Sequence, residues 1–186
     1  DELIDILDET GKVIRQEEKG KAHKLGSWHQ TAHIWIYNSK KQVLLQKRSK
    51  NKDSHPGLWD IPVGGHFQVG EKPKQAAVRE ATEEIGLRIK PESLKKIKIN
   101  KKPGTRKLML GKPWLNNEFQ HIYLLKYNGL ISGLKMIDGE VEELKFIPLK
   151  KLETDIASEE TLKHYVRHPK EYFDFVIKAI KKELKK

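Results

Sequence analysis

The chain has 186 residues and a formal net charge of +11, from 37 Lys and Arg against 26 Asp and Glu. At 37% apolar residues it is long enough to bury one core, while the absence of cysteine excludes disulfides, thiolate metal ligands and a thiol nucleophile. No stretch approaches the length of a membrane span and no signal peptide is visible, so we expect a cytoplasmic protein with no membrane partner.

Short apolar segments separated by turns dominate the first two thirds of the chain. Strands are predicted at residues 3–7, 13–15, 32–37, 43–46, 58–63, 94–99, 119–126 and 144–147. The first two pairs read as hairpins around turns at 8–11 and 38–41. From residue 161 onward the pattern is helical, with one apolar face for core packing formed by Phe173, Val176, Ile177, Ile180 and Leu184. We expect a single domain over 1–186, with an N-terminal hairpin extension over 1–27 and a C-terminal helical segment over 158–186.

The most specific signal is the run over residues 65–87. It fits the pattern G-x5-E-x7-R-E-U-x-E-E-x-G-U, in which U is apolar, and every fixed position is filled. Pro73 suits the first turn of a helix and Gly86 suits the residue just past its end. The run therefore predicts a helix of about three turns.

Three carboxylates share one face of this helix, because Glu80, Glu83 and Glu84 are spaced i, i+3 and i+4. A hard divalent cation converts their mutual repulsion into coordination, and Arg79 can hold the carboxylates in place from outside the metal shell. The alternative is an acidic surface helix with one ion pair. We favour a metal site because Gly64 and Gly65, just before the helix, let backbone carbonyls approach a ligand closely.

This run resembles the Nudix box, the signature of hydrolases that cut a diphosphate linked to another moiety. The resemblance implies an α/β fold, namely the Nudix α/β/α sandwich with a mixed sheet, an N-terminal hairpin and C-terminal helices. It also implies Mg²⁺ or Mn²⁺ as cofactor, held by Gly64, Glu80, Glu83 and Glu84. The expected catalytic residues are Glu83, Glu84, Glu140 and Arg79. The general base comes either from the box or from a later loop, where Glu140 is the closest match.

Residues 28–38, 44–48 and 56–60 extend the resemblance to the Nudix branch related to isopentenyl diphosphate isomerase type I. That branch implies a second divalent metal at a histidine-rich site formed by His23, His29, His66 and Glu118. It also implies diphosphate binding by Lys47, Arg48 and Lys52. The alternative is that the histidines and the glutamate are scattered polar residues without a function.

Two departures from the isomerase separate the chain from that activity. The isomerase's catalytic cysteine falls at Gly64, which has no side chain to move a proton, and its second glutamate ligand falls at Asn116. Conversely, the isomerase has an eroded box, whereas Glu80 and Glu83 are both in place here. Diphosphate hydrolysis is therefore favoured over double-bond isomerisation.

The expected partner is a small-molecule diphosphate, and a homodimer is left open. Candidates are nucleoside diphosphate derivatives such as ADP-ribose, oxidised nucleoside triphosphates, coenzyme A and prenyl diphosphates; Trp28, Phe67 and Trp114 could stack on a base, whereas Trp35 fits the core. Two rival hypotheses are an isomerase without cysteine, which would release no phosphate, and a nucleic-acid-binding module, which would bind RNA with a steep salt dependence. The second is disfavoured because the lysines are scattered and no stacking motif interleaves them.

Overall fold

A mixed sheet between helices forms the centre of the molecule, described in a computed structural model for residues 2–52, 54–105, 107–109, 112–136 and 139–186. Its strands are β3 (His29–Tyr37), β4 (Gln42–Arg48), β5 (Trp59–Asp60), β6 (Val63–His66), β7 (Lys95–Lys102), β10 (Glu118–Lys126) and β11 (Val141–Pro148). The spatial order is β11-β4-β3-β10-β7, with β5 beside β4 and β6 beside β3. The pair β3–β10 is parallel and the other pairs are antiparallel.

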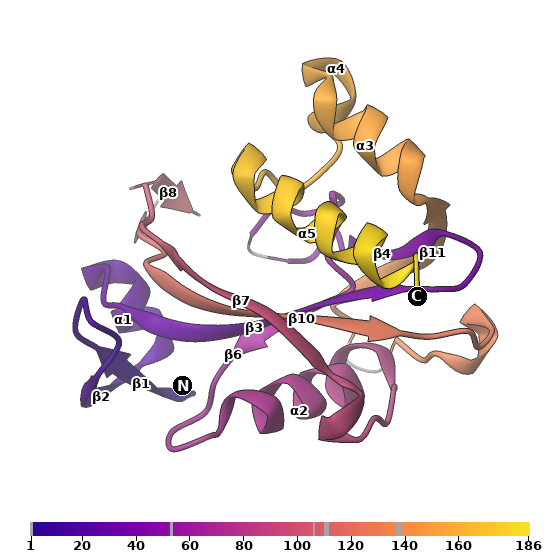
Figure 1. Cartoon of the computed structure of the whole chain (residues 1–186). Coiled ribbons are helices and arrows are strands. Elements are labelled where there is room, and N and C mark those ends of the chain that lie inside the picture. Colours follow the sequence, from indigo (N-terminus) through magenta and orange to yellow (C-terminus); the bar gives the residue numbers. More distant parts are fainter. Residues whose placement is uncertain (1, 53, 106, 110–111, 137–138) are drawn as a thin grey trace.

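Helices cover both faces of this sheet (Figure 1). Helix α2 (Pro73–Ile85) lies below it in the view, and α3 (Leu149–Ala157) and α5 (Lys170–Glu183) lie above it. Successive side chains of a strand point to opposite faces, so Ile34 packs on the α2 side and Trp35 on the α5 side. The predicted α/β/α sandwich is confirmed, as is the buried apolar face of α5, formed by Phe173, Val176, Ile177 and Ile180.

The second predicted hairpin forms its strands but pairs only at its base. Antiparallel pairing of β3 and β4 is confined to Tyr37 and Val43, after which β3 pairs with β6 and β4 pairs with β5. The strand predicted over 58–63 is likewise two strands, because Pro62 lies between β5 and β6 and has no N–H for a sheet hydrogen bond. Consequently β4 and β6 separate, and the Glu84 side chain of α2 contacts both of them.

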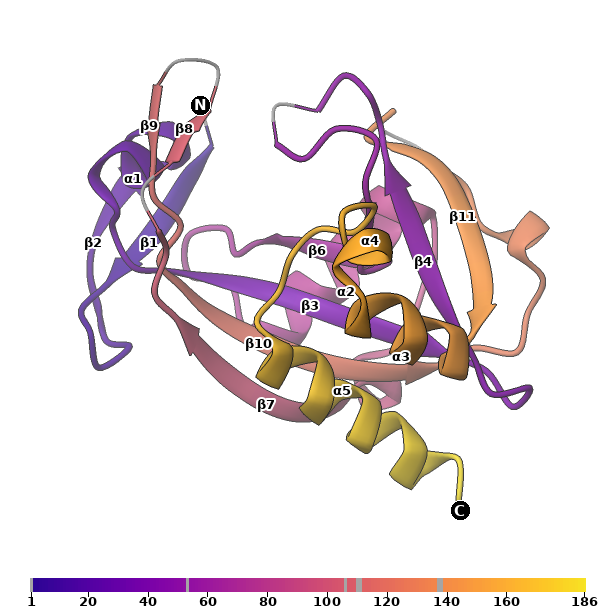
Figure 2. The same cartoon turned by 90° about the horizontal axis from the view of Figure 1, so that it is seen from above.

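The N-terminal hairpin is confirmed, as β1 (Leu3–Leu7) pairs antiparallel with β2 (Val13–Glu18). A helix that the sequence did not suggest, α1 (Lys19–Leu25), follows directly and ends at Gly26, whose φ of 71° is left-handed. A second hairpin, β8 (Lys107–Met109) and β9 (Lys112–Trp114), lies with these elements at one end of the sheet (Figure 2). The Leu115 N–H donates to the His23 carbonyl (2.9 Å), which ties α1 to the chain following β9.

The C-terminal segment is helical in two pieces rather than continuously from residue 161. Helix α4 (Glu159–Leu162) ends early, and α5 begins after Pro169. Between them the chain pairs with β5, since Trp59 N–H donates to the His164 carbonyl and Val166 N–H to the Trp59 carbonyl. Two 3₁₀ turns, η1 (Pro91–Ser93) and η2 (Ile131–Gly133), complete the fold. Within the described ranges, no helix is long and apolar enough to cross a membrane.

Candidate active site and metal centres

Helix α2 has the bounds that the motif predicted. It begins at Pro73, and Gly86 follows its last residue with a left-handed φ of 64°. At its start the Gln75 side chain accepts from the Lys72 N–H (3.2 Å), which satisfies one of the donors that a helix start leaves unpaired. Both ends are therefore fixed, and the carboxylates on this helix keep a defined position relative to β6.

Two of the three predicted carboxylates point inward, toward the glycines of β6. Glu84 is buried and accepts from the Gly64 N–H (3.3 Å) and from the Gln46 side chain (3.2 Å). Glu80 is also buried, and a Cβ at Gly65 would overlap its carboxyl group. Glycine is thus required at Gly65 because the Glu80 carboxyl occupies the space of a side chain.

Burial makes both inward carboxylates costly to ionise. It raises the pKa of Glu80 to about 7, although the Arg79 guanidinium acts in the opposite direction. Burial and the neighbouring Glu80 raise the pKa of Glu84 well above its ordinary value. Two buried oxygen ligands that resist ionisation without a nearby cation are a donor set suited to Mg²⁺ or Mn²⁺.

Arg79 links the carboxylates to the loop before the helix. Its Nη1 donates to Glu80 (2.9 Å) and to Glu83 (2.7 Å), so the predicted Arg79–Glu83 pair is present. Its Nε donates to Glu71 (2.9 Å), and its Nη2 donates to the His66 carbonyl (2.8 Å). Glu83 is more exposed than the other two carboxylates, with 52% of its side chain exposed, but it shares the Arg79 Nη1 donor with Glu80.

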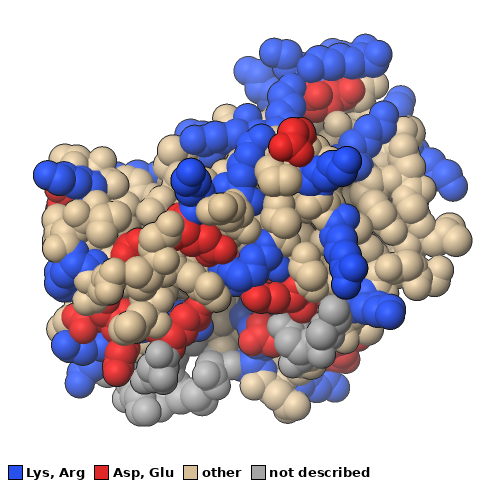
Figure 3. All heavy atoms as spheres, turned by 90° about the horizontal axis from the view of Figure 1, so that it is seen from below, with Lys and Arg blue, Asp and Glu red and all other residues tan. Residues whose placement is uncertain are grey.

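On the face that carries α2, acidic side chains gather in the lower half of the view (Figure 3). Lys and Arg side chains are most numerous along its upper edge. The net charge of +11 is therefore unevenly distributed over the surface. An acidic region in an otherwise basic protein is a local place where a cation is favoured.

The predicted phosphate-binding residues lie on β4 and the loop after it. Lys52 forms an ion pair with Glu140, and the charges of both residues act on Glu84. Lys47 pairs with Glu142 at 3.5 Å. The structure thus brings Lys52 and Glu140 into the electrostatic range of the box carboxylates.

Arg48 makes local contacts that hold the loop after β4. Its guanidinium donates to the Ser54 carbonyl (2.9 Å), to the Ser54 hydroxyl (2.7 Å) and to Asp60 (3.3 Å). These bonds tie the loop that contains Lys52 to β5. Arg48 can therefore position Lys52 in addition to any contact of its own with a phosphate.

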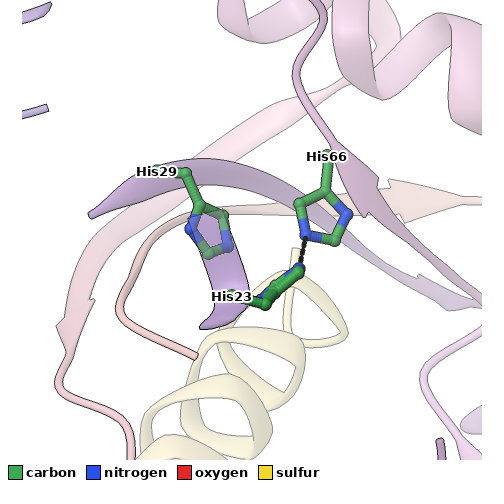
Figure 4. Close-up of side chains that lie close together, drawn as sticks. All are labelled: His23, His29 and His66. Carbon is green, nitrogen blue, oxygen red and sulfur yellow. Dashed lines mark hydrogen bonds between the residues drawn. The ribbon is translucent and has the colours of Figure 1, made fainter. Parts of the chain in front are cut away.

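Three of the four residues predicted for the second metal lie close together, beside the start of β3 (Figure 4). His23 comes from α1, His29 from β3 and His66 from β6, and their candidate ligand atoms all lie within 4.8 Å of one another. The Nε2 atoms of His23 and His66 are 3.1 Å apart. The Ser27 carbonyl fixes the ring of His29 through Nδ1 (2.9 Å). The Trp114 ring stacks on the His23 ring, with the two ring centroids 3.8 Å apart.

These imidazoles are held in their neutral form. Burial lowers the pKa of His23 to about 3, with a further contribution from His29. Burial also lowers the pKa of His29, and that of His66 falls well below its ordinary value. His23 Nδ1 and His29 Nε2 are buried and have no hydrogen-bond partner among the described residues. Neutral imidazoles with free nitrogen atoms are the form that binds Zn²⁺ and related ions.

Glu118, the fourth predicted ligand, lies directly opposite His29 in the parallel β3–β10 pair. Its carboxylate accepts from the Gln120 side chain (2.8 Å), and Lys102 lies 3.6 Å away. Although burial raises the pKa of Glu118, Lys102 and the nearby histidines hold it below its ordinary value, so the group is ionised. Within the described part of the chain it is outside the tight three-histidine group but close enough to influence the charge of His29.

Some contacts at the site were not foreseen, and one expectation was wrong. Phe67 is buried in the core at 3% exposure, so it cannot stack on a base, whereas Trp35 lies in the core as predicted. Gln46, which donates to Glu84, carries no sequence signal, because its role depends on the separation of β4 from β6. Glu71 is a fixed position of the motif, and its contact with Arg79 gives that position a structural reason.

Comparison with known proteins agrees with this geometry. The family model described as the NUDIX domain matches residues 27–168. Nudix hydrolase 3 of Arabidopsis thaliana is 31% identical over 164 residues, which cover 86% of this chain and 21% of that protein. The isopentenyl-diphosphate Delta-isomerase of Pectobacterium atrosepticum is 33% identical over 118 residues, covering 63% of this chain and 62% of that protein. The crystal structure of DR0079 from Deinococcus radiodurans has a TM-score of 0.67 at 19% identity, covering 96% of this chain and 98% of that one.

A mixed α/β sandwich with a carboxylate helix docked on a glycine-containing strand defines the class as a hydrolase of Nudix architecture. The chain belongs to the NUDIX family, whose domain model covers most of its length. The chain spans about a fifth of the curated plant relative, so nothing about that whole protein transfers directly. Its similarity to an isomerase agrees with the resemblance seen in the sequence.

Proposed function

We propose that the protein hydrolyses a diphosphate linkage in a nucleoside diphosphate derivative or related organic diphosphate, with Mg²⁺ or Mn²⁺ as cofactor. The observation that carries this proposal is the pair of buried carboxylates, Glu80 and Glu84, packed against the glycines of β6. Such a pair is costly in a folded protein unless a cation offsets its charge. Its retention on a helix with the full Nudix motif supports a catalytic metal.

The proposed ligands are the carboxylates of Glu80, Glu83 and Glu84 and the carbonyl of Gly64. When bound, the metal neutralises charge on the diphosphate and on the leaving group. Arg79 holds Glu80 and Glu83 in place through direct hydrogen bonds. The Gly64 N–H holds Glu84 in place through another hydrogen bond, so the three carboxylates are positioned even without a bound metal.

Water is activated by a carboxylate, and the structure supports two candidates. Glu84 is the more deeply buried and lies among the proposed metal ligands, beside Gly64. Glu140 is half-exposed and is paired with Lys52 on the loop side of the site. We propose Lys47 and Lys52 as phosphate contacts, with Arg48 ordering the loop that contains Lys52.

The three-histidine group supports a second metal site, which we propose as a site for a transition metal such as Zn²⁺ or Mn²⁺. Neutral imidazoles from three separate elements converge there, and two of their nitrogen atoms are buried without partners among the described residues. Glu118, opposite His29, is ionised and supplies compensating charge. Asn116 contacts His29 at the position where the isomerase branch has its second glutamate.

A substrate panel with matched variants tests the hydrolytic proposal. Purified protein is incubated with ADP-ribose, oxidised nucleoside triphosphates, coenzyme A and prenyl diphosphates in Mg²⁺, and products are separated by chromatography. We expect cleavage of at least one compound, a large loss in Glu84→Gln and none in Glu92→Gln, an exposed carboxylate on η1. Isomerisation of isopentenyl diphosphate without cleavage of any compound would instead support the isomerase.

A further inference from the structure

A cavity of about 230 Å³ lies on the far side of β4 from the box carboxylates. Successive side chains of a strand point to opposite faces. Gln46 reaches Glu84 on one face, and its neighbour Leu45 lines the cavity on the other. The cavity is therefore separated from the metal site by the strand itself, and none of the proposed catalytic residues lines it.

The cavity combines aromatic walls with cationic groups. Trp59 and Tyr165 lie in adjacent, bridged segments and both line it, with Trp59 only partly buried. Lys145 from β11 and Lys151 from α3 add positive charge, and both residues are exposed to solvent. Aromatic surface next to ammonium groups suits a ligand that has a planar ring and a separate anionic group.

An ionised acceptor completes the lining. Asp155 is buried and accepts from the Tyr165 hydroxyl (2.6 Å) and from Lys151 (2.9 and 3.0 Å). Although burial raises the pKa of Asp155, the bonds from Tyr165 and Lys151 hold it below its ordinary value. A carboxylate can accept about four hydrogen bonds, so capacity remains for an N–H donor of a ligand such as an exocyclic amine.

The volume of the cavity limits the size of the ligand that it can hold. Pockets for drug-sized molecules span roughly 300–1,000 Å³, so this smaller cavity takes a nucleoside-sized group rather than a dinucleotide. We propose that the cavity is a second ligand site, for a nucleoside monophosphate. The base lies against Trp59 and Tyr165 with its amine toward Asp155, and the phosphate lies at Lys145 and Lys151. This proposal is independent of the hydrolytic one, because the cavity shares no residue with the metal site.

Adenosine monophosphate is the probe, titrated into the 186-residue chain by calorimetry in the presence of EDTA, which removes the metal contribution of the box. We expect saturable binding that weakens at least ~10-fold in Lys145→Gln and in Lys151→Gln, which corresponds to about 1.4 kcal/mol for each lost phosphate contact. Lys150→Gln is the matched control, since Lys150 precedes Lys151 on α3, is exposed and does not line the cavity. Adenosine should bind more weakly than the monophosphate.

A second measurement covers the case in which Lys151→Gln disturbs Asp155 and the fold. Lys145→Gln is on a strand and leaves the Asp155 bonds intact, and thermal unfolding reports whether each variant folds. Trp59→Phe should remove the change in tryptophan fluorescence on adenosine monophosphate binding, while Glu84→Gln should bind like the parent. Absence of binding by the parent overturns the proposal, and so does equal affinity in the Lys145 and Lys150 variants.

Discussion

Neutralising Glu80 should stabilise the metal-free protein at alkaline pH. The pKa of its carboxyl is raised by burial from 4.5 to about 7, so between these values the folded protein holds a proton that the unfolded chain releases. The free energy of unfolding therefore falls as pH rises from about 4.5 to about 7 and stays low above that range. The pKa difference corresponds to about 3 kcal/mol at pH 8. Glu80→Gln keeps an acceptor for Arg79 but removes the charge, so it should recover most of this free energy.

Thermal unfolding in EDTA at pH 4.5 and pH 8 measures the effect. In a chain of this length, 3 kcal/mol corresponds to a rise in Tm on the order of 10 °C, and we expect this rise at pH 8 and little change at pH 4.5. Comparing variant with parent at each pH cancels the contribution of the histidines, and Glu92→Gln controls for a change in surface charge. Added Mg²⁺ should stabilise the parent more than the variant. Equal effects of Glu80→Gln at both pH values would refute the reasoning.

Three further outcomes follow from the site geometry. Glu84→Gln should lower hydrolysis at least ~100-fold in steady-state assays while circular dichroism shows an intact fold, because an amide does not offset the charge of Mg²⁺; activity within a few-fold of the parent would remove Glu84 from the metal site. His66→Ala should release a transition metal that elemental analysis finds in protein purified without chelator, and unchanged metal content would leave the histidines without a metal role. Gly65→Ala should displace the Glu80 carboxyl and reduce activity at least ~10-fold, since its Cβ overlaps that group; parent-like rates would show that the helix moves freely.

Features set by residue spacing within a single helix could be predicted from the sequence. The bounds of α2, the Arg79–Glu83 pair and the buried face of α5 follow from spacing along one element. The second hairpin was only partly right, because the choice between neighbours of β3 depends on tertiary packing rather than on the turn. Helix α1 was missed because a seven-residue segment is too short to show helical periodicity.

The site residues divide in the same way, into those predicted from the sequence and those whose contacts depend on tertiary packing. The family resemblance predicts that His23, His29 and His66 lie together, and the structure places them in one group. The contact of Gln46 with Glu84 depends on how β4 and β6 separate, which no local pattern encodes. The greater exposure of Glu83, compared with buried Glu80 and Glu84, depends on how α2 packs on the sheet, which the spacing along the helix does not encode.

Hydrolysis in water enriched in ¹⁸O is the measurement that tests the central claim most directly. The substrate is the compound that the panel shows to be cleaved, and mass spectrometry of the products locates the label. The account predicts one labelled oxygen on a phosphorus of the product, complete dependence on Mg²⁺ or Mn²⁺, and loss of label in Glu84→Gln. Rearrangement of isopentenyl diphosphate without label in phosphate, or labelling that persists in Glu84→Gln, would contradict it.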